Sequence, residues 1–245
     1  MTTLPNKNNS DADSSATSES TKPAIEGITV DCVIFGFNKA NLEVLLVQHA
    51  EGESVGKWGL LGGWVKKEES ADAAAQRVLY ELTTLDNIYL EQLKAFTDPK
   101  RVLERRVVTI GYYTLVNRED YNIKAGITLR EAKWYKINEI PDLIFDHNEI
   151  LEFSLMQLRN RVRQAPIGFN LLPEKFTLLQ LMQLYEEILG IELEKSNFRR
   201  KILHMKLLVA LDEKQQDVSH RAAKLYKFDP DIYKKLTEKG FNFEF

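Results

Sequence analysis

The hydrophobic pattern in the first two thirds of the chain predicts strands with inserted helices. Runs rich in Val, Ile, Leu and Phe predict strands at residues 28–37, 42–49, 88–96, 107–116 and 132–137, with a turn at 38–41. Ser70 is suited to cap a helix that ends near Leu82, and another helix should follow Asp146. The glycine-rich residues 56–63 are expected to interrupt regular structure. This order predicts an α/β (α+β) sandwich over residues 27–162.

The pattern becomes mostly helical after residues 163–173, which we interpret as a linker. Thr177 and Gln180 have the spacing of a capping box, and Gly190 suits the position after a helix C-terminus. The further predicted elements are a helix at 196–206, a hairpin from 207–211 and 222–228, and a last helix that begins at Asp229-Pro230 and ends at Gly240. Two helices followed by a hairpin indicate a winged helix-turn-helix domain, which we assign to residues 174–240.

Composition excludes several classes of protein. The 245 residues include 33 Lys and Arg against 36 Asp and Glu, a net charge of −3, so any nucleic-acid binding must rest on local basic clusters. No apolar run approaches the ~20 residues of a membrane span, and no export signal opens the chain, so we expect a cytoplasmic protein without a membrane partner. The single cysteine and four scattered histidines indicate neither a disulfide framework nor a metal site. The polar residues 1–26 are predicted to form a disordered tail.

One segment has the spacing of a motif for phosphate chemistry. Its matching residues are Gly63, Glu69, Arg77 and Glu81. This spacing resembles the Nudix box, in which three helical carboxylates gather Mg²⁺ against a diphosphate. At the three carboxylate positions this chain has Val78, Glu81 and Leu82, so a single acid remains.

Helical periodicity indicates what replaced the missing acids. One apolar stripe is formed by Ala71, Ala74, Ala75, Val78, Leu79 and Leu82. Glu81 follows Arg77 by four residues, within reach of an ion pair. Since one carboxylate holds Mg²⁺ poorly, we expect no catalytic residue, no metal and no other cofactor. Mg²⁺ would be required only by the alternative of an active hydrolase.

A second cluster of residues has the pattern of a nucleic-acid-binding helix. Residues 195–206 contain five basic residues and no acid, and helical spacing places Phe198, Ile202 and Met205 on one face, which should pack on the preceding helix. The other faces carry Asn197, Arg199, Arg200, Lys201, His204 and Lys206. Arginine can pair with guanine and asparagine with adenine, while flanking bases contact phosphates. The alternative is an ordinary solvated helix face.

Several segments together resemble the Nudix-related transcriptional regulators. The resemblance is carried by residues 166–178, 185–190, 197–201 and 225–228, and it is supported by 30–38 and 145–147. It implies homodimers that bind palindromic operators in double-stranded DNA, with a Nudix domain that senses a small molecule. One branch responds to ADP-ribose and another to L-arabinose, and the weakened box inclines this chain toward the sugar-sensing branch. The resemblance also implies DNA contacts at Asn197, Arg199, Arg200 and Lys201, and wing contacts at Arg221 and Lys224.

A small-molecule pocket needs a flat apolar wall and a few polar partners. The candidates are Trp58 and Trp64 for the wall, and Asp31, Glu81, Arg105 and Arg106 for the polar partners. For each of them the alternative is a purely structural role. The resulting hypothesis is a ligand-responsive, DNA-binding transcriptional regulator with a degenerate Nudix domain. The alternatives are a Mg²⁺-dependent Nudix hydrolase of nucleoside diphosphate derivatives and a protein-interaction module with neither activity.

Overall fold

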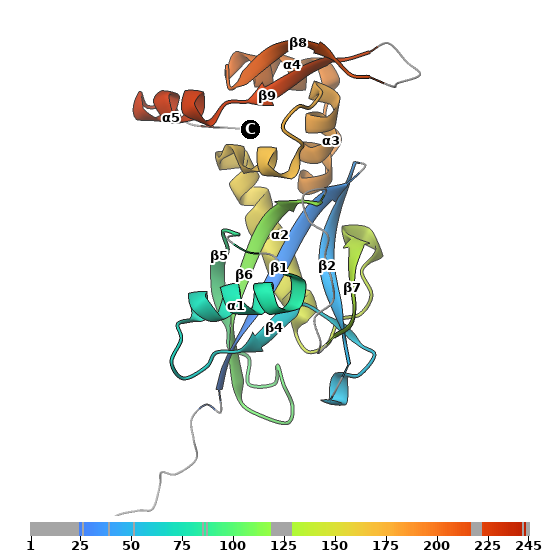
Figure 1. Cartoon of the computed structure of the whole chain (residues 1–245), viewed down its shortest axis with the longest axis vertical. Coiled ribbons are helices and arrows are strands. Elements are labelled where there is room, and N and C mark those ends of the chain that lie inside the picture. Colours follow the sequence, from blue (N-terminus) through green and yellow to red (C-terminus); the bar gives the residue numbers. More distant parts are fainter. Residues whose placement is uncertain are drawn as a thin grey trace, which may run out of the picture.

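The computed structural model describes residues 25, 27–38, 40–50, 52–84, 86, 88–118, 129–216, 222–241 and 243. They form a sheet domain followed by a helical domain that carries a hairpin (Figure 1). None of the helices in this part of the chain is long and apolar enough to cross a membrane. The tail predicted at 1–26 lies, apart from Ile25, outside the described residues.

Seven of the described strands belong to one sheet. Its central strand β1 (Gly27–Asn38) pairs in parallel with β6 (Val107–Asn117) and antiparallel with β2 (Asn41–His49) and β4 (Leu61–Trp64). The other strands are β3 (Trp58–Gly59) and β7 (Leu129–Lys136), which pair with β2, and β5 (Glu91–Phe96), which pairs with β6. Short 3-10 helices η1 (Gly52–Ser54) and η3 (Ile137–Glu139) lie in the connections.

Helices cover both faces of the sheet, α1 (Ala71–Thr83) on one side and α2 (His147–Gln164) on the other (Figure 1). The side chains of β1 alternate between the two faces. Those packed with α1 are Val30, Cys32 and Ile34, and those on the α2 side are Val33, Phe35 and Phe37. Because both faces are buried, β1 is apolar along nearly its whole length.

The predicted face and cap of α1 are largely confirmed. The Ser70 hydroxyl accepts a hydrogen bond from the Ala73 N–H at 3.1 Å. The buried residues of its apolar stripe are Ala74, Ala75, Val78 and Leu79. The Leu82 side chain, which was assigned to the same stripe, lies outside the described part of the structure.

The second domain has the order of a winged helix. Its elements are α3 (Leu178–Leu189), α4 (Lys195–His204), β8 (Leu208–Lys214), β9 (Lys224–Phe228) and α5 (Pro230–Glu238). Thr177 and Gln180 form the predicted capping box, and Gly190 ends α3 in the left-handed region with φ 68°. Asp229 caps α5, with Pro230 as its first residue, as the sequence predicted.

One local prediction was wrong in detail. The glycine-rich residues 56–63 contribute to β3 and β4 instead of interrupting the sheet, because their strand pairing uses backbone groups that glycine also carries. The segment 163–173, which we interpret as a linker, has regular structure of its own. It contains the end of α2 and the 3-10 helix η4 (Pro166–Leu171), and its residues Phe169, Leu171 and Leu172 are buried.

The η4 segment connects the cores of the two domains. The Phe169 ring stacks on the Phe228 ring of the hairpin, with centroids 4.5 Å apart and planes 11° from parallel. One hydrophobic cluster runs from β1 and α2 through η4 into α3 and α4. The sheet domain and the winged helix therefore share a core.

The shared core predicts one cooperative unfolding transition. Phe169→Ala removes a buried ring and should lower the free energy of unfolding by about 3–5 kcal/mol. Urea denaturation followed by near- and far-UV circular dichroism measures the effect. Met156→Ala, at a half-exposed position of α2, is the control and should cost far less. Separate transitions of the two domains in the parent protein would contradict a shared core.

Candidate functional site

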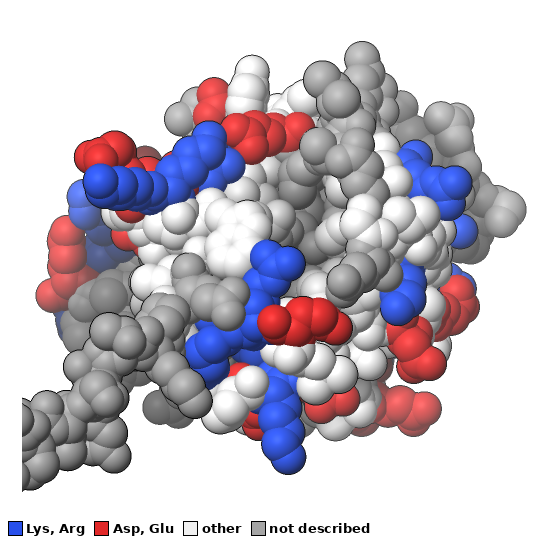
Figure 2. Space-filling model, turned by 90° about the horizontal axis from the view of Figure 1, so that it is seen from below, with Lys and Arg blue, Asp and Glu red and all other residues white. Residues whose placement is uncertain are grey.

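A cavity of about 530 Å³ lies at the end of the sheet domain away from the winged helix. Its walls come from the first half of β1, from β4, from the loop between β5 and β6, and from the start of α2. Figure 2 looks at this end of the molecule and shows basic side chains beside an uncharged surface. The volume is in the range of small-molecule binding sites.

Glycines in β3 and β4 leave room for the polar side chains of this cavity. A Cβ atom on Gly62 would lie 2.2 Å from the Asp31 Oδ1 atom, because the two residues are opposite each other in the β1–β4 register. A Cβ atom on Gly59 would lie 3.1 Å from the His147 Nδ1 atom. The glycine-rich segment therefore forms a wall against which Asp31 and His147 can pack.

A buried ion cluster forms the floor of the cavity. The Arg101 side chain donates from Nε and Nη2 to the two oxygens of Asp146, at 2.9 and 2.7 Å, and from Nη2 to Asp31 Oδ2 at 3.3 Å. Arg101 and Asp31 are 7% and 5% exposed. Because Asp146 precedes the first residue of α2, this cluster connects the loop before β6 to the start of that helix.

His147 completes the cluster as a neutral ring. Its Nδ1 accepts a hydrogen bond from the Leu60 N–H at 2.9 Å, which assigns its proton to Nε2, 3.5 Å from Asp31 Oδ1. Burial lowers the pKa of His147, against the opposing effect of the Asp31 and Asp146 carboxylates. The ring is therefore a fixed hydrogen-bonding group and not a second cation.

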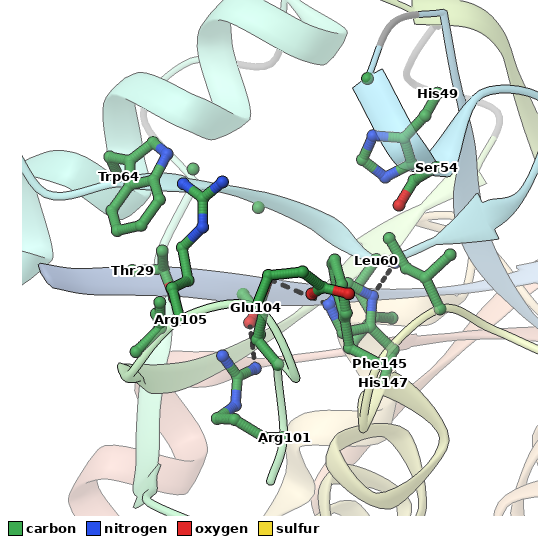
Figure 3. A pocket seen from close by; sticks show the side chains of 17 residues that line it. Thr29, His49, Ser54, Leu60, Trp64, Arg101, Glu104, Arg105, Phe145 and His147 are labelled. Atoms are coloured by element: carbon green, nitrogen blue, oxygen red, sulfur yellow. Dashed lines mark hydrogen bonds and ion pairs between the residues drawn. The ribbon is translucent and has the colours of Figure 1, made fainter. Parts of the chain in front are cut away.

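The opposite side of the cavity is more exposed. Trp64 is 46% exposed, and the Arg105 guanidinium lies 5.8 Å from the centre of its ring (Figure 3). Two buried polar atoms, Thr29 Oγ1 and His49 Nε2, have no hydrogen-bond partner within the described part of the chain. The cavity therefore offers an aromatic face and a cation to an incoming molecule, and Thr29 and His49 add polar character to its wall.

The structure brings together only some of the predicted ligand residues. Asp31, Trp64 and Arg105 line the cavity. Trp58 instead packs edge-on against Tyr135, with ring centroids 5.0 Å apart, and lines a neighbouring cavity of about 740 Å³.

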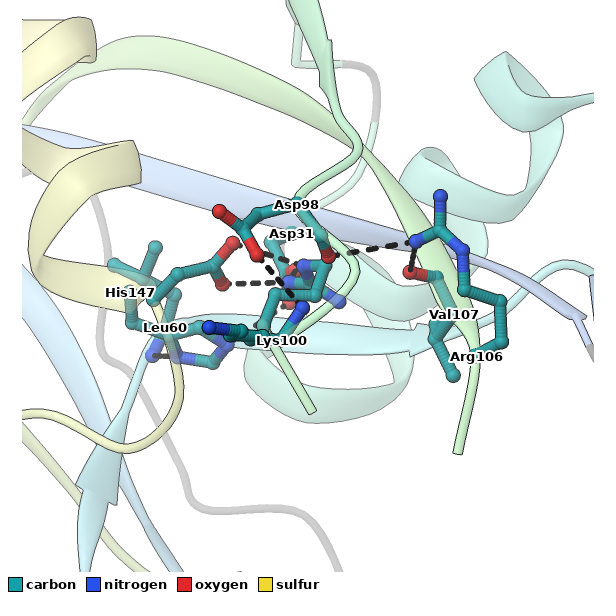
Figure 4. Close-up of polar contacts among 9 residues, drawn as sticks. Asp31, Leu60, Asp98, Lys100, Arg106, Val107 and His147 are labelled. Carbon is teal, nitrogen blue, oxygen red and sulfur yellow. Dashed lines mark hydrogen bonds and ion pairs between the residues drawn. The ribbon is translucent and has the colours of Figure 1, made fainter. Parts of the chain in front are cut away.

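Glu81 and Arg106 do not line the cavity either. Glu81 pairs with Arg77 on the exposed side of α1. Arg106 donates to the backbone oxygens of Thr97, Asp98 and Val107 at 3.1–3.4 Å, away from the buried acids (Figure 4).

Sequence reasoning missed Arg101 and His147, which are the most buried charged or ionisable partners of Asp31. In the sequence, the segment 145–147 supports the family resemblance but indicates no role for His147. Arg101 lies in a loop with no motif, about 70 residues from Asp31, so nothing local indicated the contact.

The second candidate site is the outer surface of α4. Phe198 and Ile202 are buried and Met205 is partly buried, as predicted. The six predicted DNA-contacting residues of this segment are all exposed: Asn197, Arg199, Arg200, Lys201, His204 and Lys206. Arg200 Nη2 donates to Asn197 Oδ1 at 2.8 Å, which holds the two side chains together and uses one of five guanidinium donors.

The hairpin β8–β9 stands beside α4 in the position of a wing (Figure 1). Lys224 is exposed at the start of β9, opposite Lys214. Lys175 pairs with Glu213, near the loop end of β8, at 2.7 Å and joins the hairpin to the segment before α3. Arg221, the other predicted wing contact, lies outside the described residues.

Comparison with known proteins agrees with both halves of this architecture. Residues 26–153 match the family model of the NUDIX domain, and residues 168–228 match that of the NrtR DNA-binding winged helix domain. The ADPR responsive transcriptional repressor NtrR of Acinetobacter baylyi is 32% identical over 220 residues, covering 88% of this chain and 85% of that protein. The chain belongs to the NrtR family of Nudix-related transcriptional regulators.

Solved structures support the same assignment of this NrtR-family protein. NrtR of Shewanella oneidensis in complex with a 27mer DNA aligns with a TM-score of 0.72 at 29% identity, over 88% of this chain and 97% of that one. The NUDIX domain of the same protein in complex with ADP ribose aligns with a TM-score of 0.50 at 28% identity, over 59% and 94% of the two chains. The predicted fold, a Nudix sandwich followed by a winged helix, is confirmed.

A hydrolase is also among the relatives of this NrtR-family protein. The ADP-ribose pyrophosphatase of Methanocaldococcus jannaschii is 28% identical over 51% of this chain and 70% of its own length. The remaining carboxylates of the Nudix box do not fit a Mg²⁺ site here. Arg77 binds Glu69 at 2.6 Å and Glu81 at 3.0 Å, and it also donates to the Trp64 carbonyl.

The position of the first lost acid is filled by packing. Val78 is 2% exposed, and a Cβ atom on Gly63 would lie 2.8 Å from its Cγ2 atom. The described residues contain no group of three or more acids, histidines or cysteines that could hold a metal ion. Through Arg77, which binds Glu69, Glu81 and the Trp64 carbonyl, the box forms a clasp between β4 and α1 in this NrtR-family protein.

The clasp makes the stability of this protein depend on pH in the acid range. Its hydrogen bonds, above all those from Arg77, lower the pKa of Glu69 from 4.5 to about 2. A depressed folded-state pKa stabilises the native protein above pH 4.5, and the contribution disappears as pH falls toward 2. Glu69→Gln should therefore destabilise the protein above pH 4.5 and progressively less below it. Urea denaturation across this pH range, with the exposed Glu68→Gln as control, measures the difference. An equal loss at every pH would contradict the role of the Glu69 charge.

Proposed function

We propose that this NrtR-family protein is an ADP-ribose-responsive, DNA-binding transcriptional repressor whose Nudix domain senses its effector without hydrolysing it. The observation that carries the proposal is the outer face of α4, where five of the predicted polar or basic side chains are exposed while Phe198 and Ile202 anchor the helix. The sixth, Lys206, is exposed just beyond the helix, which ends at His204 and not at residue 206 as predicted. A helix of this kind can enter the major groove, where side chains meet base edges.

The residues on this face divide into two expected roles. Arg200 and Asn197 are joined by a hydrogen bond, so their orientation is partly set before DNA binds. We assign them to base contacts. We assign Arg199, Lys201, His204, Lys206 and the wing residues Arg221 and Lys224 to contacts that fix register on the DNA backbone.

The cavity in the sheet domain supports a nucleotide-like effector. The flat π-face of adenine can stack on the half-exposed Trp64 ring, and the negative charge of a diphosphate can pair with the Arg105 guanidinium. Thr29 and His49 line the same cavity and make its wall polar enough for ribose hydroxyls. The named relatives also favour ADP-ribose over L-arabinose, the effector that the weakened Nudix box favoured in the sequence.

Helix α2 offers a physical route between the two sites. Its first residue, His147, lines the cavity, and its 18 residues extend about 27 Å. Near its other end, Arg159 Nε donates to the Ile188 carbonyl of α3 at 2.8 Å. An effector that prefers one position of α2 would shift the winged helix in the same step, since a ligand acts only through its different affinities for two states.

We further propose that the repressor binds as a homodimer to a two-fold operator. Two copies of α4 would then occupy successive major-groove sites about 34 Å apart. A small rotation of the winged helices would change that spacing and weaken binding. The stoichiometry of the DNA complex, measured in the titrations below, tests this arrangement.

Arg200→Ala should weaken binding to an operator selected from a random DNA library by about 1–3 kcal/mol and relax the base preference at one position. Fluorescence anisotropy and repeated selection with the variant measure both effects. Lys133→Ala, at an exposed position of β7 in the sheet domain, should bind as the parent protein does. If the parent protein selects no sequence, the proposed function is wrong.

ADP-ribose should raise the melting temperature of the protein and release it from its operator, because the ligand binds the native state and favours one arrangement. Trp64→Ala should weaken ADP-ribose binding about fivefold, as expected for ~1 kcal/mol of ring stacking. Tyr89→Ala removes an exposed ring outside the cavity and should have no effect.

The same samples, incubated with MgCl₂ and analysed by chromatography, should retain intact ADP-ribose. Turnover would support the hydrolase alternative, and a melting shift with L-arabinose but not with ADP-ribose would reverse the assignment of the effector.

A further inference from the structure

The last turns of α2 carry three arginines that differ in what they contact. Arg159 donates to the Ile188 carbonyl of α3. Arg161 lies 3.6 Å from the Glu91 carboxylate of β5. Arg163 is exposed, and within the described part of the chain it makes a long 3.5 Å hydrogen bond to the Arg159 carbonyl and no ion pair, so no carboxylate balances its charge there.

Arg163 also lies beside the candidate DNA-binding helix. It lines a small groove of about 190 Å³ together with Asn197, Phe198 and Lys201 of α4 and with the α3–α4 turn. Asn197 and Lys201 are one helical turn apart, at the edge of the exposed face of α4. The Arg163 guanidinium therefore extends that face by one cation that belongs to the sheet domain's own helix.

An acidic residue in the groove does not neutralise this cation. Glu194 caps α4, and its two carboxylate oxygens accept hydrogen bonds from the Ser196 and Asn197 N–H groups at 2.8 and 2.6 Å. Those bonds lower the pKa of Glu194 and hold its carboxylate against the helix end. No ion pair within 4.0 Å joins Arg163 to Glu194 in the described structure.

The geometry points to Arg163 as a DNA backbone contact, with its guanidinium bound to a phosphate beside the groove occupied by α4. This inference rests on the proposed DNA-binding function and adds a contact from outside the winged helix. An arginine fork matches two phosphate oxygens, and an unbalanced cation loses no ion pair when it binds them. Because the other end of α2 lies at the effector cavity, a displacement of the helix there would also move Arg163 and its phosphate contact.

Salt dependence distinguishes a phosphate contact from a structural role. Full-length protein is titrated with a random-sequence duplex of about three helical turns (~32 bp) at several KCl concentrations between about 50 and 200 mM. Arg163→Ala should weaken binding several-fold and reduce the slope of log K against log [KCl] by ~0.9 per bound protomer. Arg163→Lys keeps the charge and should keep the slope.

Arg161→Ala is the matched control, two residues away on a face that contacts Glu91. It should leave both affinity and slope unchanged. Melting temperatures of all variants exclude loss of fold as the cause. If Arg163→Ala keeps the parent slope while Arg200→Ala loses operator binding, the Arg163 inference is overturned and the proposed function stands. If the parent protein binds no duplex at any salt concentration, the proposed function itself fails.

Discussion

The packing of α2 is the constraint on which both candidate sites depend. Leu158 and Val162 of this helix are fully buried, in a cluster shared by the sheet, η4 and the winged helix. Its first turn is held by the Arg101–Asp146 pair, and its last turns are held against α3 by Arg159. Because a closely packed interior transmits displacement instead of absorbing it, the two ends of α2 cannot move independently.

The ion cluster at the start of α2 gives that end its position. Breaking a buried pair leaves an uncompensated charge, so Arg101 and Asp146 hold the loop before β6 against the helix more firmly than exposed pairs would. The same loop carries Arg105, which faces the accessible side of the cavity. Molecules that enter the cavity therefore meet a loop that is already joined to α2.

The Nudix box illustrates how a motif can hold two elements together when most of its acids are missing. The chain has Gly63, Glu69 and Arg77 at the expected positions of the box. These residues join β4 to α1, and their contacts do not require a metal. Val78 occupies an acid's place and packs on Gly63, and this contact needs an apolar side chain. The spacing identifies the fold, while the residue types between the fixed positions determine whether metal chemistry remains.

The sequence by itself determined the features that depend on local periodicity and capping. These include β1, β2, the apolar face of α1, the capping box of α3 and the division of α4 into a buried and an exposed face. Only the tertiary structure decided which side chains share the cavity. Asp31 meets Arg101 and His147 through a sheet register and a helix start far apart in the chain, and Trp58 and Trp64, six residues apart, line different cavities. Local spacing fixes the side of an element on which a residue lies, but contacts between distant segments are set by how those elements pack.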